Sequence, residues 1–99
     1  MIRHIVRWEL QAEALGKSKL ANAQEMANRL LALRSTVPSI RELHIHFPPE
    51  VPEGFDLELD SLFDSWAGLE AYMEHPAHQQ VVAFVKQVVA RREVDDFEE

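Results

Sequence analysis

The sequence predicts an α+β fold, a ferredoxin-like sandwich in which an antiparallel four-stranded sheet carries helices on one face. Two observations lead to this fold class. Four segments have the character of strands, and the segments between them have the periodicity or the end signals of helices. Their order is strand, helix, strand, strand, helical pair, strand, and a single layer of helices against an antiparallel sheet is the economical packing for that order.

The composition is that of one globular domain spanning residues 1–99. Hydrophobic residues make up 46% of the chain and charged residues 27%, which excludes a disordered chain. The net charge of −7 argues against a nucleic-acid partner, which requires a clustered basic face. There are no cysteines, so disulfides and thiol chemistry are excluded. No apolar run approaches the length of a signal peptide or a membrane span, so we expect a cytoplasmic protein with no membrane partner.

Residues 2–10 predict a strand with one buried face. Bulky side chains alternate there with charged ones: Ile2, Val6, Trp8 and Leu10 against Arg3, Arg7 and Glu9. His4 falls on the same face as Val6 and Trp8. Because a buried histidine needs a hydrogen-bond partner, His4 either has a structural partner or belongs to a pocket, and both alternatives stay open.

The first helix is predicted from Ser18, its N-cap, to about Ser35, after a polar connection over residues 11–17. The expected core-facing stripe consists of Leu20, Ala23, Ala27, Leu30, Leu31 and Arg34. Val37 and Pro38 end this helix.

Residues 40–47 predict a second strand, with Leu43, Ile45 and Phe47 on one face. His44 and His46 lie on the other face, where two imidazoles side by side could hold a transition metal if carboxylates supplied the remaining ligands. The spacing fixes no third ligand, so no metal site is predicted.

An extended connection rich in proline then leads to a third strand over residues 55–63. Phe55, Leu57, Leu59 and Phe63 are expected on one face, and Asp56, Glu58 and Asp60 on the other. The acidic stripe is most simply a solvated or interface-facing surface.

A pair of helices with a sharp corner follows, over residues 65–89. Upstream of the corner, Trp66, Leu69 and Met73 form a short apolar stripe that Ser65 caps. Downstream, six positions give a wide buried face: Val81, Val82, Phe84, Val85, Val88 and Val89. The chain bends at Pro76, because proline is tolerated only in the first turn of a helix or between helices.

The corner places three ionisable side chains near one another. With Pro76 at the first helical position, His75 lies near the N-cap and His78 in the first turn, where the helix dipole favours neutral imidazole. A neutral His78 beside the phenol of Tyr72 is a competent general base next to a hydrogen-bond donor for an oxyanion. The alternative is that these side chains only satisfy backbone groups at the helix ends.

A short last strand is predicted over residues 92–97, with Val94 and Phe97 as its apolar residues. With all helices on one side, the far face of the sheet would be uncovered and would carry Ile5, Leu62 and Val94 or its neighbours. A second copy that packs sheet to sheet would remove this surface from water.

Over nearly its whole length the sequence resembles the stress-responsive A/B barrel family, also called Dabb or dimeric α/β-barrel proteins. The resemblance is carried by the opening residues 2–6 with Trp8, by Val37, Pro38 and Ile40, by Phe63 and Ser65, and above all by Tyr72, His75, Pro76, Ala77 and His78 followed by residues 83–86. Arg92, Val94, Asp96 and Phe97 resemble the closing strand of the family.

The resemblance implies a homodimer through sheet faces, a dimeric α+β barrel, with a small pocket between sheet and helices. In the plant polyketide cyclase of this family, the positions matching His4, Tyr72 and His78 serve the active site, and the one matching His78 is the base in an aldol-type ring closure. Many members have no assigned reaction. Two departures from the family are Arg7, where an apolar residue usually faces the dimer seam, and His44 with His46; Arg7 needs a partner such as Asp56, Glu58 or Asp60.

Three functions are compatible with these residues. The first is a binding module whose pocket, of roughly 300 Å³ or more, takes an apolar or aromatic ligand; its expected ligand-binding residues are Trp8, Phe63, His75 and Phe84. The second is an enzyme without cofactor in which His78 removes a proton and Tyr72 with His4 stabilises the enolate. The third is a cofactor-free monooxygenase of the small kind found among related barrels.

Overall fold

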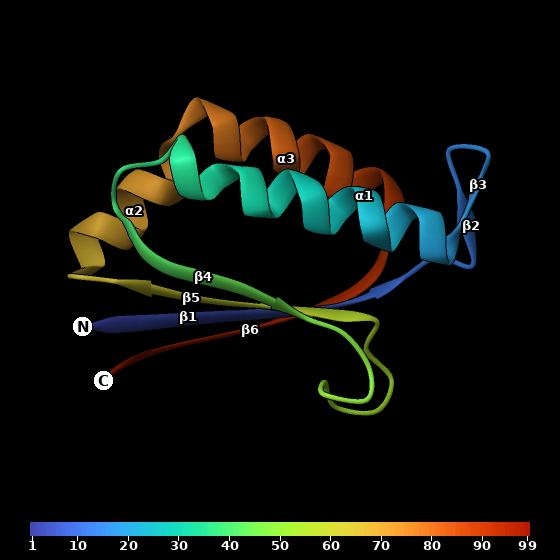
Figure 1. Cartoon of the computed structure of the whole chain (residues 1–99), viewed down its shortest axis with the longest axis horizontal. Coiled ribbons are helices and arrows are strands. Elements are labelled where there is room, and N and C mark those ends of the chain that lie inside the picture. The colour runs from blue at the N-terminus through green and yellow to red at the C-terminus, as the bar shows by residue number, and fades with distance from the viewer.

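The computed structural model describes residues 1–99 and has the predicted α+β architecture. Four strands form one antiparallel sheet in the order β4-β5-β1-β6, and all helices lie on one of its faces (Figure 1). The strands are β1 (Ile2–Leu10), β4 (Ile40–His46), β5 (Leu57–Phe63) and β6 (Val89–Glu98). The helices are α1 (Lys19–Ala32), the 3-10 turn η1 (Leu33–Ser35), α2 (Trp66–Glu74) and α3 (Pro76–Val88). The predicted strand and helix order is confirmed.

The connection after β1 contains a small hairpin that the sequence did not predict. Its strands are β2 (Glu13–Ala14) and β3 (Lys17–Ser18). Leu15 and Gly16 both have positive φ at its tip, a backbone conformation that glycine adopts without strain. Strands of two residues are too short to show a hydrophobic periodicity, so the composition of this segment predicted only a loop.

Strand β1 lies in the centre of the sheet, between β5 and β6. Its burial alternates strictly from Ile2 to Leu10, and His4 is 2% exposed. The predicted inner face is therefore confirmed, and it faces the helices.

Helix α1 is capped by Ser18, whose Oγ accepts a hydrogen bond from the Ala21 backbone N–H. The predicted stripe is only partly correct, because Leu20, Leu31 and Arg34 are exposed. The buried face is Asn22, Ala23, Met26, Ala27 and Leu30. Asn22 is inside because its side chain donates to the Ala14 carbonyl of the hairpin, so the polar group is satisfied.

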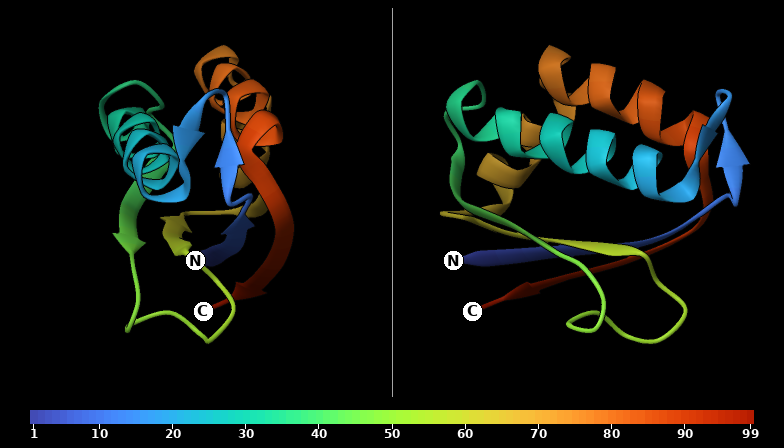
Figure 2. Two further views of the ribbon diagram at one scale, coloured as in Figure 1. Left: turned by 90° about the vertical axis from the view of Figure 1, so that its right-hand side faces the viewer. Right: turned by 45° about the vertical axis from the view of Figure 1, so that its right-hand side comes forward.

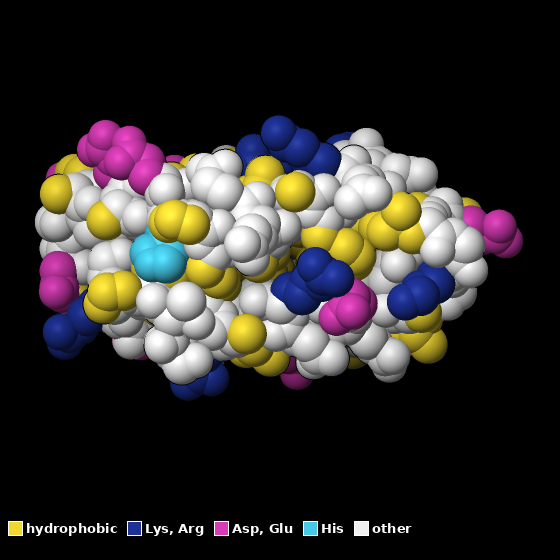
Figure 3. All heavy atoms as spheres, turned by 90° about the horizontal axis from the view of Figure 1, so that it is seen from above, with side chains coloured by type: hydrophobic (Ala, Val, Ile, Leu, Met, Phe, Trp, Pro, Cys, Tyr) yellow, Lys and Arg dark blue, Asp and Glu magenta, His cyan; other side chains and the backbone are white.

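Helices α1 and α3 lie side by side above the sheet (Figure 2). The predicted wide apolar face of α3 is confirmed for Val81, Phe84, Val85 and Val88, which are buried. Val82 is half-buried, and Val89 already belongs to β6, which begins three residues before the predicted last strand. In α2, Leu69 and Tyr72 are buried, Met73 is half-buried and Trp66 is 49% exposed, so the predicted stripe is wrong for Trp66. Seen from the helix side, charged side chains are scattered among apolar and uncharged ones (Figure 3). None of the helices combines the length and hydrophobicity that a membrane span requires.

The far face of the sheet carries ion pairs. Arg7 Nε lies 2.8 Å from Glu58, one of its three predicted partners, and Arg3 Nη1 lies 2.8 Å from Asp60. Leu62, opposite Arg3, lies on the far face as expected but is already buried within one chain. Val94, opposite Val6, belongs instead to the helix-covered face of the sheet, where it is 39% exposed.

The loop between β4 and β5 extends below the sheet, on the side away from the helices (Figure 1). Phe55, the predicted first residue of the third strand, lies before β5 and outside it. Its side chain is nevertheless buried, with the Arg91 guanidinium carbon 4.4 Å from the centroid of its ring. The Gly54 carbonyl accepts a hydrogen bond from Arg91 Nη2 at 3.1 Å. The loop is therefore tied to the far face and covers part of it.

Candidate functional site

The corner between α2 and α3 has the predicted geometry. His75 is the N-cap of α3, with Nδ1 accepting from the Ala77 backbone N–H at 3.0 Å, and Pro76 occupies the first helical position. His75 therefore satisfies a free backbone N–H at the start of α3, which is the structural role that the sequence left open for it. His78 is the third residue of α3 and is 9% exposed, turned toward the sheet.

Three rings from three elements meet beneath this corner. The ring centroids of Tyr72 and His78 are 4.3 Å apart, and those of His4 and Tyr72 are 6.1 Å apart. His4 comes from β1, Tyr72 from α2 and His78 from α3. The structure thus brings together the three side chains that the family resemblance singled out.

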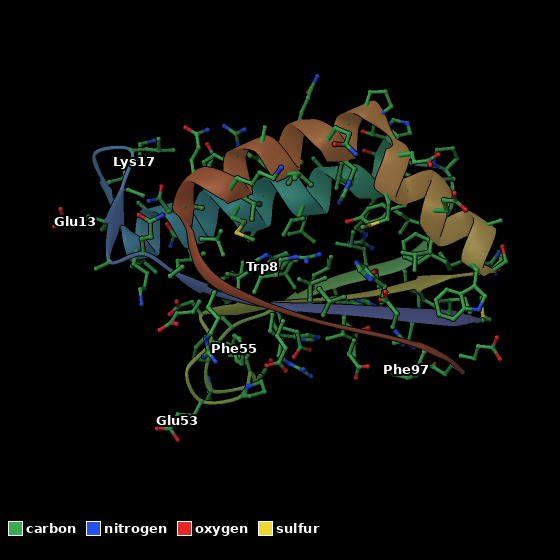
Figure 4. The ribbon with its side chains drawn as sticks, turned by 180° about the vertical axis from the view of Figure 1, so that it is seen from behind. Trp8, Glu13, Lys17, Glu53, Phe55 and Phe97 are labelled. Carbon is green, nitrogen blue, oxygen red and sulfur yellow. The ribbon has the colours of Figure 1, made fainter.

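All three rings line one cavity of about 330 Å³ between the sheet and the helices. Fifteen residues line it and ten of them are hydrophobic, among them Val6, Trp8 and Leu59 from the sheet. In Figure 4, Trp8 lies between the sheet and α3. Small-molecule binding sites usually have this composition, a mostly apolar cavity with a few polar groups.

The surroundings of His78 favour its neutral imidazole. Burial lowers its pKa below the ordinary 6.5, and the charges of His4, Arg92 and His75 act in the same direction, against a hydrogen bond to the backbone of Met73. Its Nδ1 lies 3.1 Å from the Met73 carbonyl oxygen, which can only accept, so Nδ1 carries the proton and Nε2 keeps its lone pair. Neutral imidazole was predicted from the helix dipole, but burial is the largest cause.

Tyr72 is held as a neutral phenol. The residue is 1% exposed, and burial strongly raises the pKa of its hydroxyl, while the charge of Arg92 opposes this shift. No hydrogen bond of this hydroxyl to another group of the chain contributes to the shift. The Tyr72 O–H is therefore a donor without a fixed protein partner at the edge of the cavity.

His4 has both a structural partner and a place in the cavity. Its Nδ1 contacts the carboxylate of Asp96, which faces it across the β1–β6 ladder. Its ring packs edge-on against both Phe63 and Tyr72. The two alternatives that the sequence left open thus coexist, since one ring nitrogen anchors to the sheet while the ring lines the hollow.

The four expected ligand-binding residues divide between cavity and core. Trp8 lines the cavity, and its Nε1 is buried without a hydrogen-bond partner. Phe63 and Phe84 are core residues, and His75 caps α3; none of the three lines this cavity. Phe63 contributes indirectly, because its ring lies 5.2 Å from that of Tyr72 and supports it.

Sequence reasoning missed two basic residues of the cavity, Lys86 and Arg92. Both were noticed only as parts of the family resemblance. The alternation of the last strand was a usable signal, since Arg92, Val94 and Asp96 share the face that pairs with Trp8, Val6 and His4.

The histidine pair of β4 lies on the far face. His46 stands opposite Glu58, and the ligand atoms of His46, Glu58 and Asp60 lie within 4.8 Å of one another. The structure therefore brings carboxylates to His46, as a metal site would need, but both already pair with arginines. His44 lies instead 3.5 Å from Glu42.

Solved structures similar to this chain share its fold at low sequence identity. A dimeric protein of unknown function with a ferredoxin-like fold from Bacteroides fragilis is 22% identical, with a TM-score of 0.86 over 99% of this chain and 95% of that one. A hydroxynitrile lyase from Passiflora edulis is 16% identical, with a TM-score of 0.82 over 97% and 90%. A putative antibiotic biosynthesis monooxygenase from Deinococcus radiodurans is 12% identical, with a TM-score of 0.74 over 100% and 92%.

The family is given by the sequence match itself. No curated protein matches this chain. The model of the stress responsive A/B barrel domain, Dabb, matches residues 2–99, which is nearly the whole chain, and the fold has the sheet order of a ferredoxin-like sandwich. The chain therefore belongs to the stress responsive A/B barrel domain family.

Proposed function

We propose that this protein binds a small organic molecule in the cavity between sheet and helices. The observation that carries the proposal is the convergence of His4, Tyr72 and His78 on one mostly apolar hollow of about 330 Å³. A pocket of this size takes a small ligand, and a few polar groups in an apolar lining orient it. Two of these groups, the Tyr72 hydroxyl and His78 Nε2, have no partner within the chain to compete with the ligand.

We further propose that the protein works as a homodimer through its sheet faces. The support is the half-buried Ile5 in the middle of the far face, together with similar solved structures that are described as dimeric. The Arg3–Asp60 and Arg7–Glu58 pairs would enter this interface already neutralised, which reduces the cost of burying their charges.

The binding proposal is tested by a thermal-shift screen of small aromatic and polyketide-like compounds. A ligand at about ten times its dissociation constant stabilises by about 1.4 kcal/mol, which raises the midpoint of a domain of this size by several degrees. Val82→Trp puts a large side chain at the cavity wall and is expected to abolish the shift. Ala83→Trp, on the exposed side of the same helix, is the matched control. A shift that Val82→Trp leaves unchanged places the ligand elsewhere and contradicts the proposal.

The second candidate function is proton-transfer catalysis, and the free lone pair on His78 Nε2 favours it. His78 would take a proton from a carbon next to a carbonyl, and the electron pair would move onto the carbonyl oxygen, where the Tyr72 hydroxyl stabilises the enolate. The enolate carbon then attacks a second carbonyl of the same molecule. The His78 imidazolium returns its proton to the alkoxide that forms, so the aldol-type ring closure needs no further reactant.

The catalytic candidate is tested with His78→Ala. The variant is expected to fold and to lose all turnover of a polyketide-like substrate, whereas His44→Ala, which changes an exposed side chain outside the cavity, keeps the full rate. An unchanged rate in His78→Ala would exclude His78 as the base and leave the binding function alone.

A further inference from the structure

The cavity carries two cations that no carboxylate of the chain neutralises. Lys86 extends from the last turn of α3 and Arg92 from β6, and both are exposed residues of the cavity lining. Other arginines of the sheet are paired: Arg3 with Asp60, Arg7 with Glu58 and Arg91 with Glu9. Lys86 and Arg92 form no such ion pair.

The positive charge of Lys86 and Arg92 is opposite in sign to the net charge of the molecule. The chain has 17 acidic and 10 basic residues, yet none of the fifteen residues that line the cavity is acidic. A cleft with walls of low polarity concentrates the field of the charges at its mouth. An anion is therefore attracted to this cavity, although the net charge of −7 repels it elsewhere.

The charge of Arg92 reaches the interior of the cavity. It lowers the pKa of both Tyr72 and His78, although in Tyr72 burial has the larger and opposite effect. Arg92 is also the cross-strand partner of Trp8, so the two side chains lie next to each other on the helix-covered face of the sheet. The indole Nε1–H of Trp8 can only donate a hydrogen bond, and no group of the chain accepts it. This end of the cavity therefore offers a free donor and lacks an acceptor.

We propose that the ligand of this cavity is an amphiphilic carboxylate, whose apolar body packs against the valine and leucine lining and whose carboxylate lies between Lys86 and Arg92. The inference rests on the proposed binding function and specifies the chemical class of its ligand. Guanidinium is suited to carboxylate because its N–H groups match the two oxygens, and lysine adds a mobile point charge. The competing explanation is that Lys86 only complements the C-terminal end of α3 and Arg92 only protects an edge strand.

Calorimetry with a matched pair of probes distinguishes the two explanations. 2-Naphthoate and 2-naphthamide have nearly the same shape and differ in charge. The native protein is expected to bind the anion about tenfold more tightly than the amide, which corresponds to about 1.4 kcal/mol. The preference should fall when the salt is raised from about 0.01 M to about 0.1 M, because the screening length drops from about 30 Å to about 10 Å.

The variants assign the preference to the two cations. Lys86→Gln combined with Arg92→Gln is expected to bind both probes equally, whereas Arg92→Lys keeps the charge and most of the preference. Arg34→Gln removes an exposed cation that does not line the cavity, and it should bind like the native protein. Equal binding of the two probes by the native protein overturns the anion preference and leaves the binding function standing. Failure of both probes to bind at millimolar concentration overturns the binding function and this inference together.

Discussion

Removal of the Tyr72 hydroxyl separates the role of this residue in folding from its role in the cavity. Tyr72→Phe keeps the ring, which is 1% exposed and packs 5.2 Å from Phe63 and 4.3 Å from His78, measured between ring centroids. Packing of this kind is worth about 0.5–1.5 kcal/mol for each aromatic pair, and the substitution preserves it. Only the O–H is lost, and it makes no hydrogen bond to the chain that contributes to its pKa.

The expected change in the free energy of unfolding is therefore within about 0.5 kcal/mol, or a small gain, because no protein hydrogen bond breaks and a desolvated hydroxyl disappears. Ser61→Ala is the matched control. Its Oγ is fully buried and donates to the His4 carbonyl at 2.9 Å, so the loss of this hydroxyl breaks a real bond and should cost about 1 kcal/mol. For a ligand that accepts from Tyr72, Tyr72→Phe should weaken binding about twofold to tenfold.

The assay is urea unfolding of the native protein and both variants at one protein concentration, since the proposed dimerisation would make the midpoint depend on concentration. Equal slopes with shifted midpoints report stability alone. If Tyr72→Phe lost as much stability as Ser61→Ala or more, the hydroxyl would have a structural partner, and the assignment of Tyr72 as a free donor would be wrong.

Three further outcomes are expected. Burial lowers the pKa of His78 in the folded chain, so the stability that its neutral form contributes is fully present above pH 6.5 and is lost as the pH falls from 6.5 through the folded-state pKa. Urea midpoints measured between pH 8 and pH 5 should show this loss in the native protein and in the control His44→Gln. The loss should be smaller in His78→Gln. Ile5 is flanked on its sheet face by carboxylates, so Ile5→Lys should fold but yield a monomer in sedimentation, whereas Leu20→Lys on α1 should remain a dimer. A dimeric Ile5→Lys variant would refute the sheet-face interface. His75→Ala removes the cap of α3 and should lower the free energy of unfolding by about 1 kcal/mol without changing binding of 2-naphthoate, and a large loss of affinity would give His75 a direct ligand contact.

Local sequence signals were sufficient wherever one element decides its own structure. The alternation from Ile2 to Leu10 placed His4 on the inner face, Ser18 marked the start of α1, and Pro76 marked the start of α3. These signals are reliable because period, capping and the missing N–H of proline are properties of a few consecutive residues.

The rotation of the helices was less well determined. In α1 the expected stripe included Leu20 and Leu31, but Asn22 and Met26 are inside instead. In α2 the stripe included Trp66, which is exposed, whereas the buried Tyr72 was not part of it. Helices of two to four turns fit more than one apolar stripe, and the partner surface selects among them; for Asn22, the selecting contact is the Ala14 carbonyl of a hairpin that the sequence did not reveal.

By itself the sequence determined the order of the elements, the inner face of β1, the corner at Pro76 and, through family resemblance, the three residues of interest. Only the tertiary structure decided that His4, Tyr72 and His78 share a cavity, that Asp96 holds His4, and that Lys86 and Arg92 stand unpaired at the same cavity. The physical reason is that these contacts join residues from both ends of the chain. Strand order and register, which depend on all the packing at once, bring β6 beside β1 and α3 above it.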